Sequence, residues 1–382
     1  MKLLFFKSNI FMQEDWLETL QRAGYDVDPI TYVFTDYMED GFFAKKFRRR
    51  LQKISYDAVL SFNFYPVISD ICQEFHVTYI SWIYDSPIPH FHRYDTPCNH
   101  VYHFDRIEVE ELQSQGCAQV SHLPLAVNTE RLDRQLGILN EMPEYRHDIS
   151  FVGNLYTDRS IQSRNFVSSE YIQGILQGYA AAQTQFFHQD IAMELLESSP
   201  YINTHAFSQD FPVESLARAI QEEATHQERI RLLWRLSQHF PVDLYTSEHV
   251  ADAGNLQVHP AIGYYTEMPH VFRHSRINLN INYRTIRSGM SARLLDVMGC
   301  GGFLLTTPQP ELFDYFQPDR DFVAYSSLEE LEDKCCYYLS HEEERHQIAK
   351  NGYEKIKKAH TYEMRFPALF SALHKHGSFT SV

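Results

Sequence analysis

Cationic and small residues gather around the start of one predicted helix, over about residues 291 to 298. Arg287, Ser288 and Gly289 precede this helix in a polar loop, and Arg293 lies in its first turn. The N-terminus of a helix carries partial positive charge, so a cation there is unfavourable unless an anion is nearby. A glycine lets the backbone approach a ligand closely, and arginines beside a helix N-terminus suit a phosphate group. One interpretation of this pattern is therefore a phosphate site.

A carboxylate follows on the same side of the predicted helix. Asp296 lies three residues after Arg293, where its oxygens could accept hydrogen bonds from the hydroxyls of a sugar. The alternative is a buried crossover helix whose Arg293 and Asp296 form a surface ion pair. The local pattern by itself favours neither interpretation.

Two apolar segments of strand type flank this helix, Ile277–Ile281 before it and Phe303–Thr307 after it. Strand, helix and strand in such short order form a βαβ unit, so the sheet is predicted to be parallel. The first half of the chain alternates in the same way. It predicts strands at Leu3–Phe6, Ala58–Phe62, Val77–Tyr84, His100–Phe104 and Val120–Leu123, and helices at Asp15–Ala23, Pro66–Phe75 and Arg106–Gln115, the last capped by Asp105.

The second half begins after a predicted polar linker, about Thr129 to His147. A strand from Asp148 to Val152 then runs directly into a glycine turn. Residues 160 to 240 lack strand patterning and predict a helical insert. We expect a loop at His259–Tyr265 and a last helix from Tyr362 to His374.

The run SGMSARLLDVMGCGGFLL, which starts at Ser288, resembles the donor-binding motif of GT-B glycosyltransferases. It is most similar to the spore-maturation, CgeB-type branch of these enzymes. The similarity covers most of the chain but is specific mainly from Tyr264 onward. Many GT-B enzymes carry two glutamates eight residues apart here, and this chain has Ser288 and Asp296 in their places. Further parts of the resemblance are Ile277–Asn282, Lys350–Tyr353 and His360–Tyr362.

The resemblance implies an α/β protein of GT-B type, with two Rossmann-like parallel-sheet domains that face each other across a cleft. Residues 1–130 would form the acceptor domain. Residues 147–359 would form the nucleotide-sugar domain, with the helical insert at about 160–240. A C-terminal helix, about residues 360–376, would pack back on the first domain.

The resemblance also implies roles for the donor-binding residues. Asp296 would hold the ribose, and Arg287, Arg293, Gly289 and Gly153 would receive the diphosphate. Asn154 belongs to the turn after the strand at Asp148–Val152, which resembles the phosphate-proximal turn of a GT-B donor domain, and Arg159 lies just beyond it. Tyr264 or Tyr265 could hold the nucleotide base, and the alternative for each is a packed aromatic residue in a turn. Ser288 completes this set, and either it or Ser291 can cap the helix.

An inverting transfer also needs a general base on the acceptor side. Asp85, at the end of a predicted buried strand, is the first candidate, and Asp15 and His90 follow it. The alternative for Asp85 is an Asx-turn before Pro87.

The function that these features predict is the transfer of a hexose from a nucleoside diphosphate sugar, most simply a UDP-sugar, to a hydroxyl on a glycan or surface protein. Two other classes stay open, because one fold carries several chemistries. One is a non-catalytic structural or sensor protein of a cell or spore surface. The other is a sugar-nucleotide epimerase, which would act without an acceptor.

Composition limits the partners and the compartment. The 382 residues contain 34 lysines and arginines against 50 aspartates and glutamates, a formal charge of −16. Such a balance argues against a protein that binds nucleic acid or anionic membranes, although it is compatible with a local basic pocket for a phosphorylated ligand. Six cysteines without metal spacing indicate reduced thiols in a cytoplasmic protein, and no stretch reaches the length of a membrane span.

Neither a metal nor a cofactor is expected, since the nucleotide sugar would be a substrate. Two D-x-D sequences occur, at Asp26–Asp28 and Asp319–Asp321, but neither lies in a nucleotide-binding context. The histidines at 90, 92, 100 and 103 lack an acidic or cysteine partner at a fixed spacing.

Overall fold

The structure is a computed structural model that describes residues 1–8, 11–34, 36–86, 92–137, 142–161, 170–187, 189–200, 213–371 and 373. The chain divides into two compact units. The first comprises Met1–Arg131, Ser288–Met290 and Lys358–Val382, and the second comprises Leu132–Arg287 and Ser291–Lys357.

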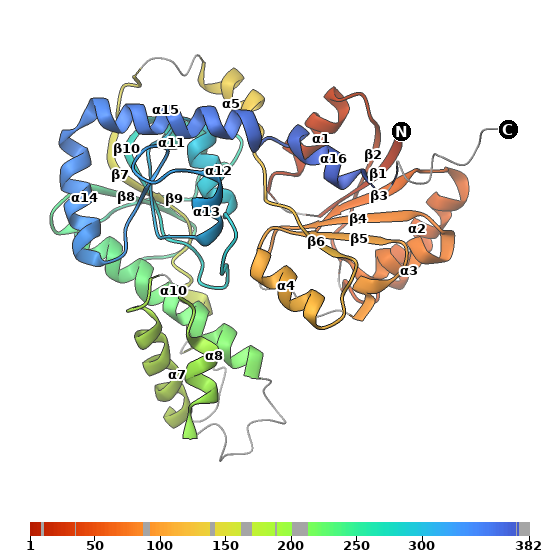
Figure 1. The fold of residues 1–382 in the computed structure, drawn as a ribbon, viewed down its shortest axis with the longest axis horizontal. Coiled ribbons are helices and arrows are strands. Elements are labelled where there is room, and N and C mark those ends of the chain that lie inside the picture. The colour runs from red at the N-terminus through yellow and green to blue at the C-terminus, as the bar shows by residue number, and fades with distance from the viewer. Residues whose placement is uncertain are drawn as a thin grey trace. The chain divides into compact units, whose positions relative to one another are not determined.

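The first unit is built on a six-stranded parallel sheet with the order β2-β1-β3-β4-β5-β6 (Figure 1). Because β1 lies between β2 and β3, the chain reverses its direction of travel across the sheet after β2. The strands are β1 (Lys2–Lys7), β2 (Asp26–Thr31), β3 (Ala58–Phe62), β4 (Thr78–Ile83), β5 (Asn99–His103) and β6 (Val120–His122).

Alternate residues of β1 face opposite sides of this sheet, as the two-residue period of a strand requires. Leu4 and Phe6 join the buried cluster on the side of α2 (Gly41–Lys53), α3 (Pro66–Phe75) and α4 (Arg106–Ser114). Phe5 contacts the ring of Phe62 on the other side, where α1 (Gln13–Arg22) packs through Trp16.

The C-terminal segment also belongs to the first unit. Trp16 contacts the rings of Tyr362 and Phe366, at centroid distances of 5.5 and 5.4 Å. The predicted continuous helix from Tyr362 to His374 is wrong: a 3-10 turn, Glu363–Arg365, precedes the short helix α16, Phe366–Leu369. The reason is Pro367, which lacks the N–H that a continuous helix would need and therefore lies at a helix start. Residues 374–382 are outside the described part of the chain.

The second unit is built on another six-stranded parallel sheet, with the order β12-β11-β10-β7-β8-β9. Its strands are β7 (His147–Val152), β8 (Val242–Thr246), β9 (Gln257–Pro260), β10 (Ser275–Asn280), β11 (Leu304–Thr306) and β12 (Val323–Ala324). The helices that accompany it are α11 (Met268–His274), α12 (Ala292–Gly299), α13 (Pro310–Tyr315), α14 (Leu328–Ser340) and α15 (Glu342–Ala359).

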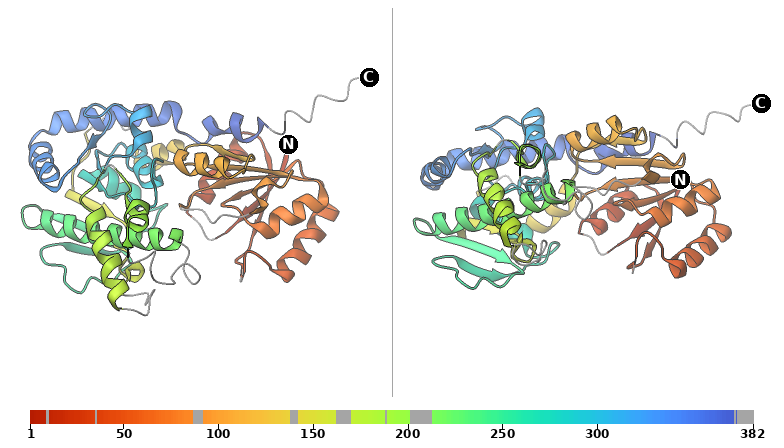
Figure 2. Two further views of the ribbon diagram at one scale, coloured as in Figure 1. Left: turned by 60° about the horizontal axis from the view of Figure 1, so that its bottom comes forward. Right: turned by 90° about the horizontal axis from the view of Figure 1, so that it is seen from below.

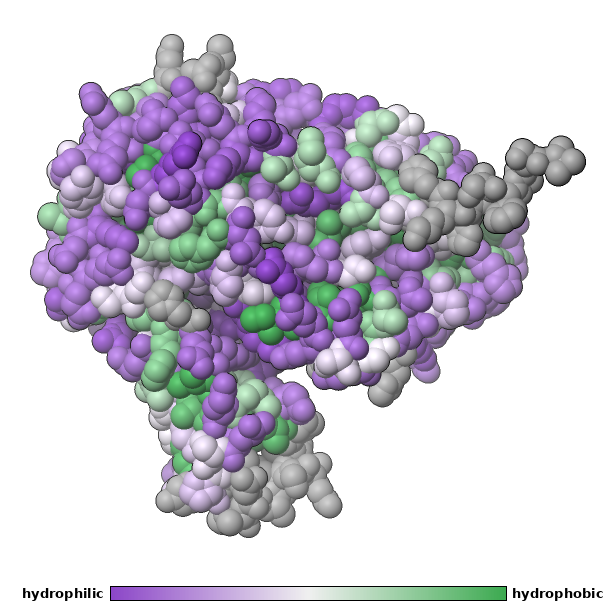
Figure 3. Space-filling view, viewed as in Figure 1, coloured by the Kyte–Doolittle hydropathy of each residue, from purple (hydrophilic) through white to green (hydrophobic). Residues whose placement is uncertain are grey.

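The helical insert lies between β7 and β8 and has a core of its own (Figures 1 and 2). Its helices are α7 (Glu170–Gln183), α8 (Ala192–Glu197) and α10 (Val213–Ser237). The first half of α10 packs in the insert through Leu216 and Ile220, whereas its second half packs on the sheet through Leu232, Leu233 and Leu236. Hydrophobic side chains show on the surface of the insert in Figure 3, and Tyr171 is 58% exposed there.

Two further predictions in the second half are corrected. Helix α5, Thr129–Leu136, occupies part of the predicted linker, because Leu132 is buried and anchors it. Strand β9 takes in His259 and Pro260, which were expected in a loop, because β8 supplies it with an ordered neighbour. None of the helices in the described part of the chain combines the length and the apolar character that a membrane span requires.

Candidate functional site

The carboxyl ends of β7 and β10 form the topological switch point of the second sheet. After β7 the chain continues to one side of the sheet, and after β10 it continues to the other side. The two strands pair in parallel, and their continuations lead into the insert and into α12 respectively. Ligands of such open sheets bind at the carboxyl ends of the strands, where this divergence opens a crevice. Gly153 and Asn154 follow β7 there, as predicted, and Ile281 and Asn282 follow β10.

Arg229 of α10 is a buried cation at these strand ends. It donates from Nη1 to the carbonyl of Asn154 and from Nη2 to the carbonyl of Ile281, the latter at 2.7 Å. Its guanidinium carbon lies 4.7 Å from the ring centre of Tyr156, and its Nε has no hydrogen-bond partner within the described part of the chain. It forms no ion pair with any carboxylate among the residues that the structure describes. Burial lowers the pKa of this guanidinium, and the nearby charge of Arg293 adds to the effect.

Sequence reasoning missed Arg229, although the sequence contains a signal for it. Arg229, Leu232, Leu233 and Leu236 are spaced so that they share one face of α10, and that face is buried. An arginine on the apolar face of an amphipathic helix is uncommon, because burying a charge is costly unless something binds it. The position of Arg229 therefore indicates a requirement for positive charge at the strand ends.

Arg159 lies beside this cation in a layer of aromatic rings. Its Nη1 donates to the hydroxyl of Tyr283 at 3.1 Å, and that hydroxyl donates to Glu222 at 2.6 Å. The ring of Tyr283 lies 4.8 Å from that of Tyr156. Part of Arg159 stays in contact with solvent, since its side chain is 42% exposed.

Helix α12 brings Arg293 and Asp296 together as predicted. The distance from Arg293 Nη1 to Asp296 Oδ2 is 3.9 Å, and Arg293 also contacts the sulfur of Met268. Asp296 is 7% exposed, and its Oδ1 accepts a hydrogen bond of 2.9 Å from the hydroxyl of Tyr264. Tyr264 is itself buried, so the structure gives it contact with the acidic side chain and not an open ring surface.

The N-cap of α12 is Ser291, but its hydroxyl makes no capping bond to the helix. It donates instead to Oδ1 of Asn282, at 3.1 Å. Ser288 does not cap this helix either, and lies in the first unit with Asp105. The amides at the start of α12 therefore receive no hydroxyl cap, which suits an anion from outside the protein.

Asp105 organises Ser288 and Gly289 within the first unit. Its carboxylate accepts hydrogen bonds from the Ser288 amide at 2.9 Å, the Ser288 hydroxyl at 2.8 Å and the Gly289 amide at 3.2 Å. It also caps α4, as predicted, by accepting from Ile107. A Cβ atom on Gly289 would lie 2.8 Å from the carbonyl oxygen of Phe104, so the close approach expected at this glycine is an approach to Phe104.

The pKa of Asp105 has a consequence for acid stability. Burial pushes this pKa upward, but the bonds from Ser288 and Gly289 outweigh burial and hold it below the ordinary 3.8. A lowered native pKa gives stability that is present above the unfolded-state pKa and is lost as the pH falls through the native pKa. We expect the free energy of unfolding of Asp105→Asn to lie about 1–3 kcal/mol below that of the wild type near neutral pH. The gap should close below about pH 4, which urea unfolding across a pH series would measure. A gap that is constant from neutral to acid pH would contradict the prediction.

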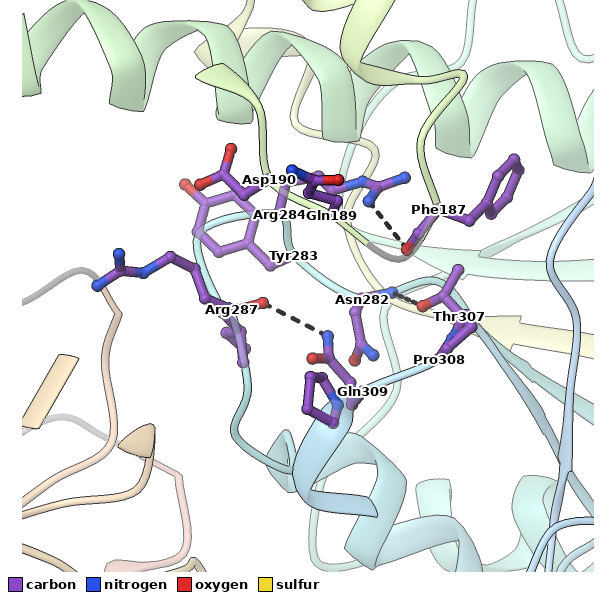
Figure 4. A pocket seen from close by; sticks show the side chains of 12 residues that line it. Phe187, Gln189, Asp190, Asn282, Tyr283, Arg284, Arg287, Thr307, Pro308 and Gln309 are labelled. Carbon is purple, nitrogen blue, oxygen red and sulfur yellow. Dashed lines mark hydrogen bonds between the residues drawn. The ribbon is translucent and has the colours of Figure 1, made fainter. Parts of the chain in front are cut away.

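A small polar pocket of about 30 Å³ lies beside the loop that follows β10 (Figure 4). The side chain of Asn282 points into the space between Gln309 and Pro308, and the guanidinium of Arg287 extends away from it. Oδ1 of Asn282 accepts from Asn280 and Ser291, whereas its buried Nδ2 has no partner among the described residues. The pocket is lined by Phe187, Gln189, Asp190, Asn282, Tyr283, Arg284, Ile286, Arg287, Thr307, Pro308, Gln309 and Pro310.

The three candidate bases differ in their surroundings. Asp85 is exposed at the end of β4 and accepts a hydrogen bond of 2.6 Å from Asn63. Asp15 is 1% exposed, and its two oxygens accept hydrogen bonds from Arg131 at 2.6 and 3.1 Å, which is a structural contact within the first unit. Burial nevertheless raises the pKa of Asp15, against the effect of Arg131. His90 lies outside the described residues.

The two D-x-D sequences are engaged in ion pairs. Asp28 accepts from Arg50 and Tyr56, and Asp321 accepts from Lys355. Among the residues described, no group of three or more histidine, cysteine or acidic side chains could hold a metal ion.

Comparison with known proteins gives a family match over part of the chain and a fold for nearly all of it. Residues 215–371 match the model of a family described as glycosyl transferase-like. The fold is that of the GT-B glycosyltransferases. None of the curated proteins that were searched matches the chain.

Three solved structures show the fold along nearly the whole chain. Sucrose-phosphate synthase from Thermosynechococcus elongatus is 10% identical, with a TM-score of 0.56 over 98% of this chain and 100% of its own. T4 phage BGT, in complex with its substrate UDP-glucose, is 9% identical, with a TM-score of 0.54 over 98% and 99%. HepE from Anabaena, in complex with UDP and glucose, is 9% identical, with a TM-score of 0.51 over 100% of both chains. At such identities the likeness concerns the fold, and the GT-B class predicted from the sequence is confirmed.

Proposed function

We propose that this protein is a glycosyltransferase that moves a hexose from a UDP-sugar to a hydroxyl group on a glycan or a surface protein. The observation that carries the proposal is Arg229, a buried cation that no described carboxylate neutralises, at the strand ends where a GT-B nucleotide site is expected. The UDP and UDP-glucose in the compared HepE and T4 phage structures support the choice of nucleotide.

The positive charge would act on the leaving group. When the bond between the anomeric carbon and the diphosphate oxygen breaks, negative charge develops on the diphosphate. Arg229, Arg293 and the uncapped amides of α12 would face that charge, and fixed cations and dipoles stabilise such a charge without rearrangement. Arginines and helix amides suffice for this task, so we propose a transfer that is independent of metal.

The rest of the donor would bind along α12 and the β10 loop. Asp296, held in place by Tyr264, would accept hydrogen bonds from the ribose hydroxyls. The Nδ2 group of Asn282, which needs an acceptor, would bind an oxygen of the hexose in the polar pocket. Asp85 would take the proton of the acceptor hydroxyl, since it is an exposed carboxylate just after β4.

A thermal-shift titration tests the proposal. Purified protein would be titrated with UDP, GDP, dTDP and their hexose conjugates, next to the variants Asp296→Ala and Asp333→Ala. A ligand at a hundred times its Kd adds about 2.7 kcal/mol to the free energy of unfolding. We expect uridine nucleotides to stabilise the wild type and Asp333→Ala, an exposed control on α14, but not Asp296→Ala.

Two outcomes would contradict the proposal. If no nucleotide shifts the melting temperature of well-folded protein, the donor site is absent. If a UDP-hexose is converted to its epimer without an acceptor, the protein is an epimerase and not a transferase.

A further inference from the structure

Helix α2 of the first unit concentrates positive charge in a chain whose formal charge is −16. Its 13 residues, GFFAKKFRRRLQK, include no acidic side chain. Six of them are cations: Lys45, Lys46, Arg48, Arg49, Arg50 and Lys53. The net charge of the whole chain therefore does not describe the field near this helix, because charges farther away than about 10 Å are screened at 0.1 M salt.

The two faces of α2 differ sharply. Phe43, Phe47 and Leu51 are buried in the core of the first sheet, which fixes the orientation of the helix. The opposite face is exposed, and its members follow one another at intervals of three or four residues along one side. These exposed residues, here named the α2 face, are Phe42, Lys45, Lys46, Arg49 and Lys53.

The cations of the α2 face are directed to solvent. Arg48 pairs with Glu74 at 2.7 Å, and Arg50 binds Asp28, so these two are neutralised within the unit. The four cations of the α2 face form no ion pair with any residue that the structure describes. Their charge is therefore available to an external partner.

Exposed apolar side chains lie at the start of the same helix. Phe42 is 73% exposed and Val33 is 71% exposed. Val33 lies beside the start of α2, because Tyr32 and Phe34, the residues on either side of it, both contact residues there. The hydroxyl of Tyr32 donates to Asp40, the N-cap of α2, at 2.9 Å, and the ring of Phe34 lies 4.7 Å from that of Phe43.

We propose that the α2 face and Val33 bind an anionic lipid surface. A basic helix that lies in the membrane interface combines exposed apolar side chains, which enter the acyl boundary, with cations that attract anionic headgroups. The exposed phenylalanine and valine favour a membrane over a nucleic acid, whose phosphates would use the cations alone. This property goes beyond the proposed sugar transfer and does not depend on it.

Sedimentation with lipid vesicles tests the proposal. The full-length protein would be mixed with vesicles of phosphatidylcholine alone or of phosphatidylcholine with phosphatidylglycerol. We expect binding to the anionic vesicles only, and binding that weakens as salt is raised from 50 to about 500 mM, because salt screens exposed charges.

Two variants separate the contributions. The triple variant Lys45→Glu, Lys46→Glu, Arg49→Glu is expected to lose at least about 100-fold in affinity for anionic vesicles, since each cation near the surface contributes severalfold. Phe42→Ser is expected to lose about tenfold, because the ring no longer enters the lipid. Unchanged midpoints of urea unfolding would show that both variants are folded.

Matched controls test whether vesicle binding depends on the α2 face itself or only on the net charge of the protein and on exposed aromatic side chains in general. Arg231→Glu, Lys350→Glu, Lys358→Glu changes the net charge equally at other places and should keep vesicle binding. Phe313→Ser removes a ring that is 44% exposed in the second unit and should also keep it.

Three results would overturn the proposal. The first is wild-type protein that does not bind anionic vesicles at low salt. The second is equal loss of binding in the two triple variants. The third is a protein that binds heparin through Lys45 and Lys46 but does not bind anionic vesicles. That result would indicate that the α2 face binds a soluble polyanion.

Discussion

Arg284→Met is expected to lower the free energy of unfolding by about 3–5 kcal/mol, because it leaves a buried carboxylate without its cation. Arg284 donates from Nε to Glu228 at 2.7 Å and also binds the second oxygen of that carboxylate. Its Nη1 reaches the carbonyl oxygens of Phe186 and Phe187, at 3.0 and 3.3 Å. The arginine thus joins the β10 loop to α10 and to the connection between α7 and α8. Equilibrium unfolding in urea would measure the loss.

An exposed ion pair on the same helix provides the control. Arg235 binds Glu332 at 2.7 Å, but the side chain of the arginine is 48% exposed. Removing such a pair costs about 0–1 kcal/mol, so Arg235→Met should be nearly neutral. The double variant Glu228→Met, Arg284→Met should be less destabilised than the two single changes added together, because it buries no unpaired charge. Equal effects of Arg284→Met and Arg235→Met would contradict this account of the pair.

Arg229→Met is expected to weaken UDP binding by about 10- to 100-fold. The reason is that hydrogen bonds to a charged group contribute about 1.5–3 kcal/mol to the binding free energy, and the variant loses them. The variant keeps the length and the apolar contacts of the side chain but removes the charge at the ends of β7 and β10. It also releases the carbonyls of Asn154 and Ile281, which the guanidinium now fixes in place. Calorimetric titration of folded variant with UDP would give the affinity.

Two further substitutions serve as controls for the effect of Arg229→Met on UDP binding. Arg231→Met removes an exposed cation two residues away on α10 and should bind UDP as the wild type does. Arg229→Lys keeps the charge but cannot bridge two carbonyls with a planar fork, so it should recover part of the affinity. Full UDP affinity in Arg229→Met would show that this arginine serves folding alone, and would remove the observation on which the proposed function rests.

Much of the fold was accessible from the sequence. The boundaries of β3 and α3 agree with the prediction residue for residue, and the predicted cap of α4 by Asp105 is confirmed. These elements have unambiguous local signals: continuous apolar strands, Pro66 at a helix start and an acidic cap. The GT-B class followed from the alternation of such elements together with a motif around α12.

Two of the errors, at α5 and β9, occurred where tertiary contacts outweigh local signals. Helix α5 has few apolar residues, so its sequence is typical of a linker, and the burial of Leu132 stabilises it. Strand β9 is exposed along most of its length, and it forms because β8 offers hydrogen bonds.

The same distinction between local signals and tertiary contacts applies to the candidate site. The sequence by itself determined which residues stand near the strand ends, since Gly153, Arg293 and Asp296 are placed by the period and the breaks of their own elements. Only the tertiary structure decided what they meet: Tyr264 holds Asp296, Ser288 binds Asp105, and Arg229 arrives from a helix in the insert. The spacing of residues along an element determines which side chains share a face of it. A buried polar group must form a hydrogen bond, but its partner depends on which distant segment packs against that face.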